Sequence, residues 1–298
     1  MKYSEKSKPI VCMQTNSTCY KGTTTMTPKG VLWHSTGANN PNISRYVQPL
    51  ETDKNYQEMI ALLGKNRYGN DWNHISRKAG MNCWIGKLAD GTVATVQTMP
   101  WNYKPWGCGS GSKGSLNNTH MQFEICEDDL NSKAYFEAVY KEACEITAYY
   151  CTMYGLDPLG TFVYNGVTVP VITTHDESYD LKLGSNHGDP TKWLKKYGKT
   201  MDDARKDVAA IMRGEVKPAE PAPASKGNAI SLRTLSSGSK GEDVKALQIL
   251  LTGRGVSTDP DGSFGPKTLN AVKTYQKKVG LDADGIVGVL TWSKLLGV

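Results

Sequence analysis

Residues 184–190 read Gly-Ser-Asn-His-Gly-Asp-Pro, a glycine-rich loop that carries a His-x-Asp pair. Two further histidines, His34 and His175, each stand at the end of a short apolar run. Zinc in hydrolases usually takes three protein ligands from His, Asp, Glu and Cys and leaves the fourth position for water. Because strand ends and loops can bring distant ligands together, the sequence predicts a zinc site formed by His34, His175 and Asp189.

Each residue of this set also has a simpler interpretation. Taken alone, a histidine at a strand end is more often a partly buried side chain with satisfied hydrogen bonds than a metal ligand. The joint pattern with Asp189 favours metal binding. His187 is the alternative to Asp189 as third ligand, because histidine is also a good ligand for zinc.

Length and composition indicate a globular protein with one good-sized core and a small second domain. The 298 residues are 39% hydrophobic and 21% charged, which is ordinary for that class. The net charge of +6 is spread out, so it does not indicate nucleic-acid binding, yet it suits a polyanionic surface such as a bacterial wall. Seven cysteines without a CxxC pair predict buried, reduced thiols rather than a disulfide framework.

No run of the sequence is long and apolar enough to span a bilayer, and no apolar segment follows the charged residues 1–9. The sequence therefore predicts neither membrane insertion nor a signal peptide. We expect a protein that is made and kept in the cytoplasm until another factor releases it.

Hydrophobic periodicity predicts a succession of strands and helices up to residue 212. Residues 82–96 contain two apolar runs around Asp90-Gly91, which is typical of a hairpin. The clearest helix is Ser132–Tyr154, closed by Gly155. The other expected elements are strands at 29–34, 119–126 and 169–175, helices at 57–63 and 204–212, and a long loop at 101–118 that could form a substrate wall.

The predicted strand at 119–126 alternates in polarity. Successive side chains of a strand point to opposite faces, so every second residue shares a face. One face should carry Met121, Phe123 and Ile125, and the other Gln122, Glu124 and Cys126.

The composition changes after residue 213. Residues 214–231 are rich in proline and alanine, which predicts a semi-extended linker. Beyond them, Asp261–Thr268 and Asp284–Thr291 share the pattern D-G-x-x-G-x-x-T, and each leads into helical periodicity. Together with a helix at 243–251 they predict a compact three-helix unit. It contains no residues of catalytic character, so we expect a binding module.

This C-terminal unit resembles the peptidoglycan-binding type 1 domain over residues 232–298. The match is carried by residues 235–248, 261–268, 271–276 and 284–292. The resemblance implies that bacterial peptidoglycan is the partner of the chain.

The N-terminal part resembles the zinc N-acetylmuramoyl-L-alanine amidases of the amidase-2 (peptidoglycan recognition protein) family, in the form found in clostridial prophage endolysins. The resemblance covers about residues 9–212 and is carried by segments 30–37, 90–93, 123–125, 174–175 and 187–190. It implies an α/β fold, a mixed central sheet flanked by helices, with zinc in a groove on one face. The predicted organisation is a zinc amidase domain at 1–213, a linker at 214–231 and a three-helix bundle at 232–298.

The resemblance also implies a role for each site residue. His34, His175 and Asp189 correspond to the family's zinc ligands, and Asp189 precedes a proline as the family's third ligand does. Glu124 corresponds to the family's catalytic glutamate. His187 takes the place of the group that stabilises the oxyanion.

The implied reaction is hydrolysis of the amide between the lactyl group of N-acetylmuramic acid and L-alanine of the stem peptide, by a zinc-bound water. Glu124 would move the proton from this water to the leaving amine, with Glu127, Asp128 and Asp129 as nearby alternatives. Three other functions compete: a recognition protein that binds peptidoglycan without cleaving it, a zinc peptidase that cuts within the stem peptide, and a structural wall-attachment protein. The complete ligand set favours the enzyme, and the expected lack of a signal peptide favours an endolysin released by a holin.

Overall fold

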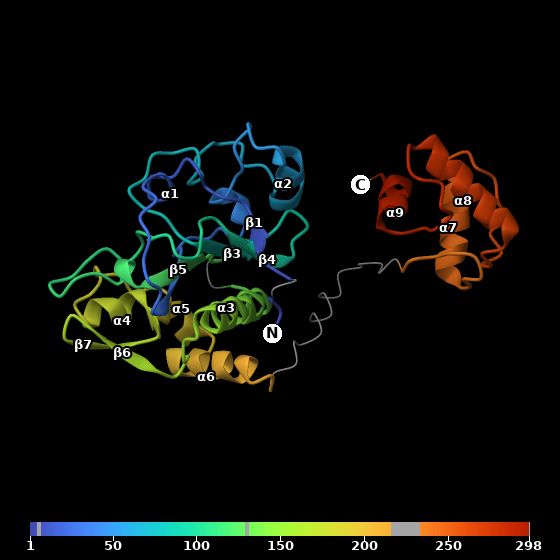
Figure 1. The fold of residues 1–298 in the computed structure, drawn as a ribbon. Coiled ribbons are helices and arrows are strands. Elements are labelled where there is room, and N and C mark those ends of the chain that lie inside the picture. The colour runs from blue at the N-terminus through green and yellow to red at the C-terminus, as the bar shows by residue number, and fades with distance from the viewer. Residues whose placement is uncertain (5–6, 129–130, 216–232, 298) are drawn as a thin grey trace. The chain divides into compact units, whose positions relative to one another are not determined.

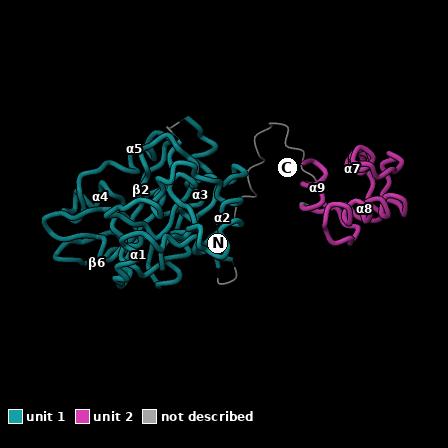
Figure 2. Tube along the Cα trace, turned by 90° about the horizontal axis from the view of Figure 1, so that it is seen from above, with its two compact units in different colours: residues 1–219 teal, residues 220–298 magenta. Residues whose placement is uncertain are grey.

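The computed structural model describes residues 1–4, 7–128, 131–215 and 233–297. The chain divides into two compact units, Met1–Ala219 and Glu220–Val298 (Figure 2). Residues 216–231 of the predicted linker lie outside the described residues. Within the described parts, no helix is long and apolar enough to cross a membrane.

The first unit is built on a mixed six-stranded sheet in the order β1-β4-β3-β5-β2-β8. Strand β2 lies between β5 and β8 and is parallel to both, whereas β3 and β4 form the predicted antiparallel hairpin. The α/β prediction is therefore confirmed. The strands are β1 Ile10–Val11, β2 Gly30–Ser35, β3 Cys83–Lys87, β4 Val93–Gln97, β5 His120–Ile125 and β8 Ile172–Thr174.

Helices cover both faces of this sheet. The long helix α3 (Lys133–Tyr154) packs against one face, and α6 (Met201–Met212) packs against α3 (Figure 1). Ser132 caps α3 at its start and Gly155 ends it in the left-handed conformation, as predicted. The remaining helices of the unit are α1 Thr18–Lys21, η1 Ile43–Arg45, α2 Tyr56–Leu63, η2 Leu116–Asn118, α4 His175–Asp180 and α5 Thr191–Lys196.

The predicted alternation of the strand at 119–126 is confirmed. Met121, Phe123 and Ile125 lie in the main core with α3. The neighbouring strand β2 alternates in the same way, because Val31 and Trp33 also belong to this core. His34 of β2 and Gln122 and Glu124 of β5 therefore share the face of the sheet that looks away from α3. All seven cysteines are free thiols and six of them are buried, as expected.

The single strand predicted at 169–175 is wrong. Strand β7 (Val167–Pro170) pairs with β6 (Thr161–Tyr164) in a separate hairpin, and only β8 joins the central sheet. Pro170 has no N–H to donate, so it ends the first pairing. The hydroxyl of Thr174 then accepts a hydrogen bond from the Glu177 amide and caps α4, so that His175 begins a helix rather than ending a strand.

The C-terminal unit has the three predicted helices, α7 (Glu242–Gly253), α8 (Pro266–Lys278) and α9 (Val289–Leu296). Its repeated pattern has a clear physical basis in a buried glutamine. Nε2 of Gln248 donates to Asp261 Oδ1 at 2.8 Å, to the Ser263 carbonyl at 3.1 Å and to Thr268 Oγ1 at 2.9 Å. Its Oε1 accepts from the Gly262 amide at 2.9 Å.

Gln276 repeats this arrangement in the second loop. Its Nε2 donates to Asp284 Oδ1 at 2.7 Å, to the Ile286 carbonyl at 3.0 Å and to Thr291 Oγ1 at 3.2 Å. Its Oε1 accepts from the Gly285 amide at 2.9 Å. Each D-G-x-x-G-x-x-T loop is thus fastened by one glutamine from the preceding helix.

We expect Gln276→Leu to destabilise the C-terminal unit by about 1–3 kcal/mol, because buried polar groups of the loop lose their partner. Hydrogen exchange of residues 233–297 in the full chain, followed by mass spectrometry, measures the effect. Thr274→Val is the matched control, since the exposed Thr274 hydroxyl bonds only the Asn270 carbonyl of its own helix. Equal protection in the two variants would contradict the role of Gln276.

The two loop aspartates predict an acid limit to stability. The Gln248 amide lowers the pKa of Asp261, and the Ile286 amide followed by Gln276 lowers that of Asp284. Their contribution is fully present above the unfolded value of about 4 and is lost as the pH falls through the lowered pKa values. Below about pH 4 the amides of the C-terminal unit should therefore lose protection against hydrogen exchange. The loss should be less steep in the Asp261→Asn, Asp284→Asn double variant. In Asp282→Asn it should equal that of the wild type.

Candidate metal centre and active-site cavity

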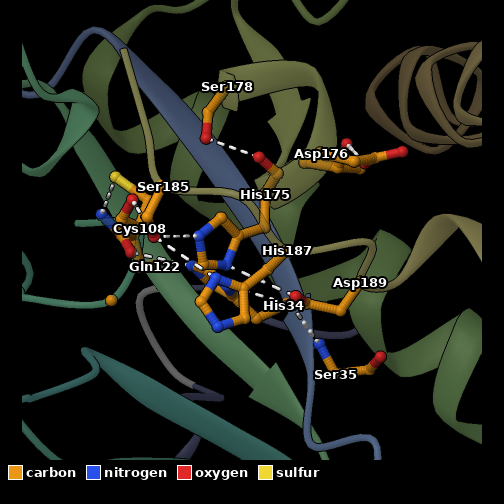
Figure 3. Close-up of polar contacts among 12 residues, drawn as sticks. His34, Ser35, Cys108, Gln122, His175, Asp176, Ser178, Ser185, His187 and Asp189 are labelled. Carbon is orange, nitrogen blue, oxygen red and sulfur yellow. Dashed lines mark hydrogen bonds and ion pairs between the residues drawn. The ribbon is translucent and has the colours of Figure 1, made fainter. Parts of the chain in front are cut away.

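The parallel strands β5, β2 and β8 bring the predicted ligands to the same end of the sheet. His34, near the end of β2, is the register partner of Glu124 on β5. On the other side of β2, Trp33 pairs with Thr174, so His175 follows at the same end. Asp189 reaches this end from the loop before α5, and all three predicted ligands lie together in Figure 3.

The geometry of the three side chains fits a zinc ion. Asp189 Oδ2 lies 3.2 Å from His34 Nδ1, and Asp189 Oδ1 lies 3.4 Å from His175 Nδ1. One ligand atom from each residue lies within 4.8 Å of the others. Tetrahedral zinc with bonds of about 2.0–2.2 Å requires ligand atoms about 3.3 Å apart. Two imidazoles and one carboxylate are also the ligand types of catalytic zinc.

The charge state of Asp189 suits this role. Burial alone would raise its pKa, but hydrogen bonds and charge from His175 and His34, when their Nδ1 atoms carry hydrogens, outweigh burial and hold the pKa well below the ordinary value. The Ser35 amide also donates to Asp189 Oδ2 at 3.3 Å. Asp189 is therefore a carboxylate at neutral pH.

A cavity of about 540 Å³ opens beside the three ligands. Every predicted site residue contributes to its wall, so the structure brings the whole predicted set together. The lining residues are His34, Ser35, Thr36, Gly37, Gly107, Glu124, Glu127, His175, His187, Gly188, Asp189, Pro190, Lys192 and Trp193.

The two glutamates of the cavity differ in their partners. Oε2 of Glu124 is buried and has no hydrogen-bond partner among the described residues. Burial, followed by the charges of Asp189 and Glu127, raises the pKa of Glu124 well above its ordinary value. Glu127 instead accepts a hydrogen bond from the Ser35 hydroxyl. Of the two, Glu124 is the carboxylate that has an oxygen available for a proton.

His187 lies at the rim of the cavity rather than among the ligands. Its ring stacks on His175 with centroids 4.5 Å apart, and its Nδ1 lies 3.3 Å from Ser185 Oγ. The cluster of three ligand atoms contains Asp189 and not His187. His187 is exposed, so its second ring nitrogen can meet a substrate.

Some residues of the site were missed by sequence reasoning. Gln122 and Ser185 each contact the second ring nitrogen of a predicted ligand, at 2.9 Å from His34 Nε2 and 3.1 Å from His175 Nε2. Lys192, in the first turn of α5, places a positive charge beside the cavity. The polar face of the alternating strand was the only signal for Gln122, and none marked the other two.

Comparison with known proteins agrees with this geometry. Residues 24–192, more than half of the chain, match the N-acetylmuramoyl-L-alanine amidase family, and residues 240–295 match a family of peptidoglycan binding domains. The cluster of His34, His175 and Asp189 is consistent with a metal site of the kind held by amidases of this family. The chain belongs to the N-acetylmuramoyl-L-alanine amidase (amidase-2) family and carries a C-terminal peptidoglycan binding domain.

Individual relatives cover parts of the chain. A probable N-acetylmuramoyl-L-alanine amidase of Bacillus licheniformis is 31% identical over 182 residues, which are 60% of this chain and 46% of that protein. The zinc D-Ala-D-Ala carboxypeptidase of Streptomyces albus G is 48% identical over 65 residues, 21% of this chain and 26% of that enzyme. The structure of the Staphylococcus aureus hydrolase AmiA is 20% identical, covering 71% of this chain and 89% of that one, with a TM-score of 0.45. The chain thus spans less than half the length of the first two relatives.

We expect Asp189→Ala to weaken zinc binding by more than about 100-fold, because even the loss of an outer contact costs about 10- to 100-fold. Competition with a chromophoric chelator measures the dissociation constant of the full chain. Asp180→Ala, at the exposed end of α4, is the matched control. Undiminished binding in Asp189→Ala together with weak binding in His187→Ala would make His187 the third ligand.

Proposed function

We propose that this chain is a zinc-dependent amidase that hydrolyses the bond between N-acetylmuramic acid and the L-alanine of the peptidoglycan stem peptide. One observation carries the proposal: the His34–His175–Asp189 cluster faces the same cavity as Glu124, whose Oε2 has no hydrogen-bond partner among the described residues. Membership of the amidase family and the attached peptidoglycan binding domain support the substrate.

The ligand cluster prepares the cavity for an amide carbonyl. When bound to His34, His175 and Asp189, zinc supplies a Lewis acid that polarises the substrate carbonyl and lowers the pKa of water. An amide is a poor electrophile, so both effects are needed at neutral pH. The buried rings of His34 and His175 keep bulk water away from one side of the cluster.

Glu124 is the residue that moves the proton. Its raised pKa brings a carboxyl group closer to neutral pH, where proton exchange with water and with an amine is most efficient. Its free oxygen takes the proton from the attacking water and then gives it to the leaving amine of L-alanine. The neighbouring charge of Glu127 helps this transfer, because it stabilises the protonated form of Glu124.

His187 contributes a further group to the same cavity. Its Nδ1 lies 3.3 Å from Ser185 Oγ, so its Nε2 is the nitrogen that can reach the oxyanion of the tetrahedral intermediate, to which it donates when both ring nitrogens carry a hydrogen. Stacking on His175 fixes the plane of its ring. A hydrogen bond that exists only when the oxyanion has formed lowers the barrier rather than the substrate's dissociation constant.

The C-terminal unit would hold the enzyme on its polymeric substrate. A binding domain joined to a catalytic domain raises the local concentration of the catalyst at the wall without any new contact at the active site. The family match at residues 240–295 supports peptidoglycan as the ligand of this unit.

We expect Glu124→Gln to lower kcat by about 10²- to 10⁴-fold while the zinc dissociation constant stays unchanged. Purified Gram-positive cell wall is digested with and without chelator and with zinc added back, and mass spectrometry identifies the products. New N-terminal L-alanine supports the amidase. Glu137→Gln, which alters an exposed glutamate of α3, is the matched control.

Other outcomes would select the competing functions. Cleavage at an internal bond of the stem peptide would make the chain a zinc peptidase. Tight binding to wall that stays intact would make it a recognition protein. A loss of activity in Glu127→Gln that is absent in Glu124→Gln would move the proton transfer to Glu127.

The route to the wall is a further proposal. We propose that the enzyme acts as an endolysin, accumulating in the cytoplasm and reaching the wall through a holin-type membrane lesion. Lysis of cells that express the chain only when a pore-forming protein is co-expressed would support this route. Lysis without the pore former would contradict it.

A further inference from the structure

The second ring nitrogen of His34 is held by a buried amide. His34 Nε2 lies 2.9 Å from Oε1 of Gln122, which is fully buried on β5. A metal ligand histidine must keep its coordinating nitrogen free of hydrogen, and the partner of the other nitrogen decides this. The question is therefore what makes Gln122 present its oxygen, rather than its NH₂, to His34.

The orientation of Gln122 depends on backbone groups that can only donate or only accept a hydrogen bond. The amides of Gly107 and Cys108 can only donate, and both donate to Asn117 Oδ1, at 3.1 and 3.2 Å. The Gly109 carbonyl can only accept, and it accepts from Asn117 Nδ2 at 2.9 Å. Asn117 is fully buried at η2, so this turn fixes which way its side-chain amide faces.

This orientation passes from Asn117 to the metal centre. Asn117 Oδ1 also accepts from Gln122 Nε2 at 2.9 Å, so Gln122 must turn Oε1 toward His34. An acceptor at this position requires a hydrogen on His34 Nε2. The lone pair is then on Nδ1, which is the atom 3.2 Å from Asp189.

The same turn also reaches the second histidine. The Cys108 carbonyl accepts from the Ser185 amide at 2.7 Å and from Ser185 Oγ at 3.2 Å. A hydroxyl that donates to this carbonyl accepts from His175 Nε2, which lies 3.1 Å away (Figure 3). His175 Nδ1 is thereby left free toward Asp189, as in His34.

Two glycines allow the turn to come this close. A Cβ atom on Gly107 would lie 2.3 Å from Gln122 Oε1. Gly109 has a φ of +63°, and a Cβ there would lie 2.7 Å from Ser185 Oγ. The glycines of this segment are thus explained by the approach of the backbone to the two residues that orient the histidines.

We propose that Asn117 and Gln122 are positioning residues that set the tautomer of His34, with the Gly107–Gly109 turn as the common support of both histidine ligands. The inference rests on the proposed metal site. It adds that metal affinity is determined in part by the polarity of backbone groups that do not touch the metal ligands.

Two measurements on the full chain test the proposal. Long-range ¹H–¹⁵N spectra of the metal-free protein report which nitrogen of His34 carries the hydrogen. Competition with a chelator reports the zinc dissociation constant. In Gln122→Met and Asn117→Leu we expect a mixture of His34 tautomers and a dissociation constant raised about 10- to 100-fold.

Two further variants separate positioning from general damage. Gln122→Glu keeps an acceptor for His34 Nε2, so it should retain the wild-type tautomer and bind zinc more tightly than Gln122→Met, even with a lower Tm. Asn118→Ala removes a hydrogen bond to Tyr164 from the same short helix without touching the chain of amides, and should leave both readouts unchanged.

The outcomes distinguish this inference from the metal site itself. A wild-type chain that does not bind zinc would overturn the metal site. If the wild type binds zinc, equal affinities and an unchanged His34 tautomer in Gln122→Met and Asn117→Leu would overturn only the positioning role. Equal losses in Gln122→Met and Gln122→Glu would also overturn it, because acceptor polarity would then be irrelevant. If Gln122→Met and Asn117→Leu do not fold, the tautomer of His34 is measured in Gln122→Glu instead. An altered tautomer in that variant would overturn the positioning role.

Discussion

The site depends on the convergence of three atoms that carry lone pairs: Nδ1 of His34, Nδ1 of His175 and a carboxylate oxygen of Asp189. Without a cation or protons between them, such atoms repel one another, so the surrounding structure must hold them in place. The pairing of β2 with β5 does this for His34, and the pairing of β2 with β8 fixes Thr174, the residue directly before His175. The position of Asp189 is fixed at the start of α5 and by the Ser35 amide.

The two faces of the sheet divide the tasks of stability and chemistry. On β2 and β5 the face toward α3 carries apolar side chains, and the Trp33 indole N–H donates to the Thr147 hydroxyl at 3.1 Å. The other face carries His34, Gln122 and Glu124 on adjacent positions of β2 and β5. Period-two alternation therefore produces both the core and the site from the same strands, so a register shift of one residue would destroy both.

Much of this organisation could be predicted from the sequence, because it follows from short-range patterns. Alternation in β5, the caps of α3 and the histidines at the edge of the sheet are all visible within about ten residues. The error at 169–175 arose because one apolar run serves two sheets, and only tertiary pairing decides where it divides. The contact between His34 and Gln122 joins residues 88 positions apart, and no local pattern encodes it. Residues 101–118 were expected as a loop that could form a substrate wall; Gly107 does line the cavity, and Asn117 also holds the turn that contains it.

Buried glutamines connect these observations. Gln122, Gln248 and Gln276 are at most 2% exposed, and the two glutamines of α7 and α8 lie on the helix face that also carries the buried apolar residues. A primary amide carries donors and an acceptor at one end, so it joins neighbours only when their polarities match. In the C-terminal unit Gln248 and Gln276 each hold a loop through such bonds. At the metal centre Gln122 donates to Asn117 and therefore turns its oxygen toward His34. A hydrophobic residue would fill the same space but could neither donate nor accept a hydrogen bond, and a carboxylate would lack the donors. A buried primary amide therefore fixes the direction of the hydrogen bonds around it, in addition to filling space.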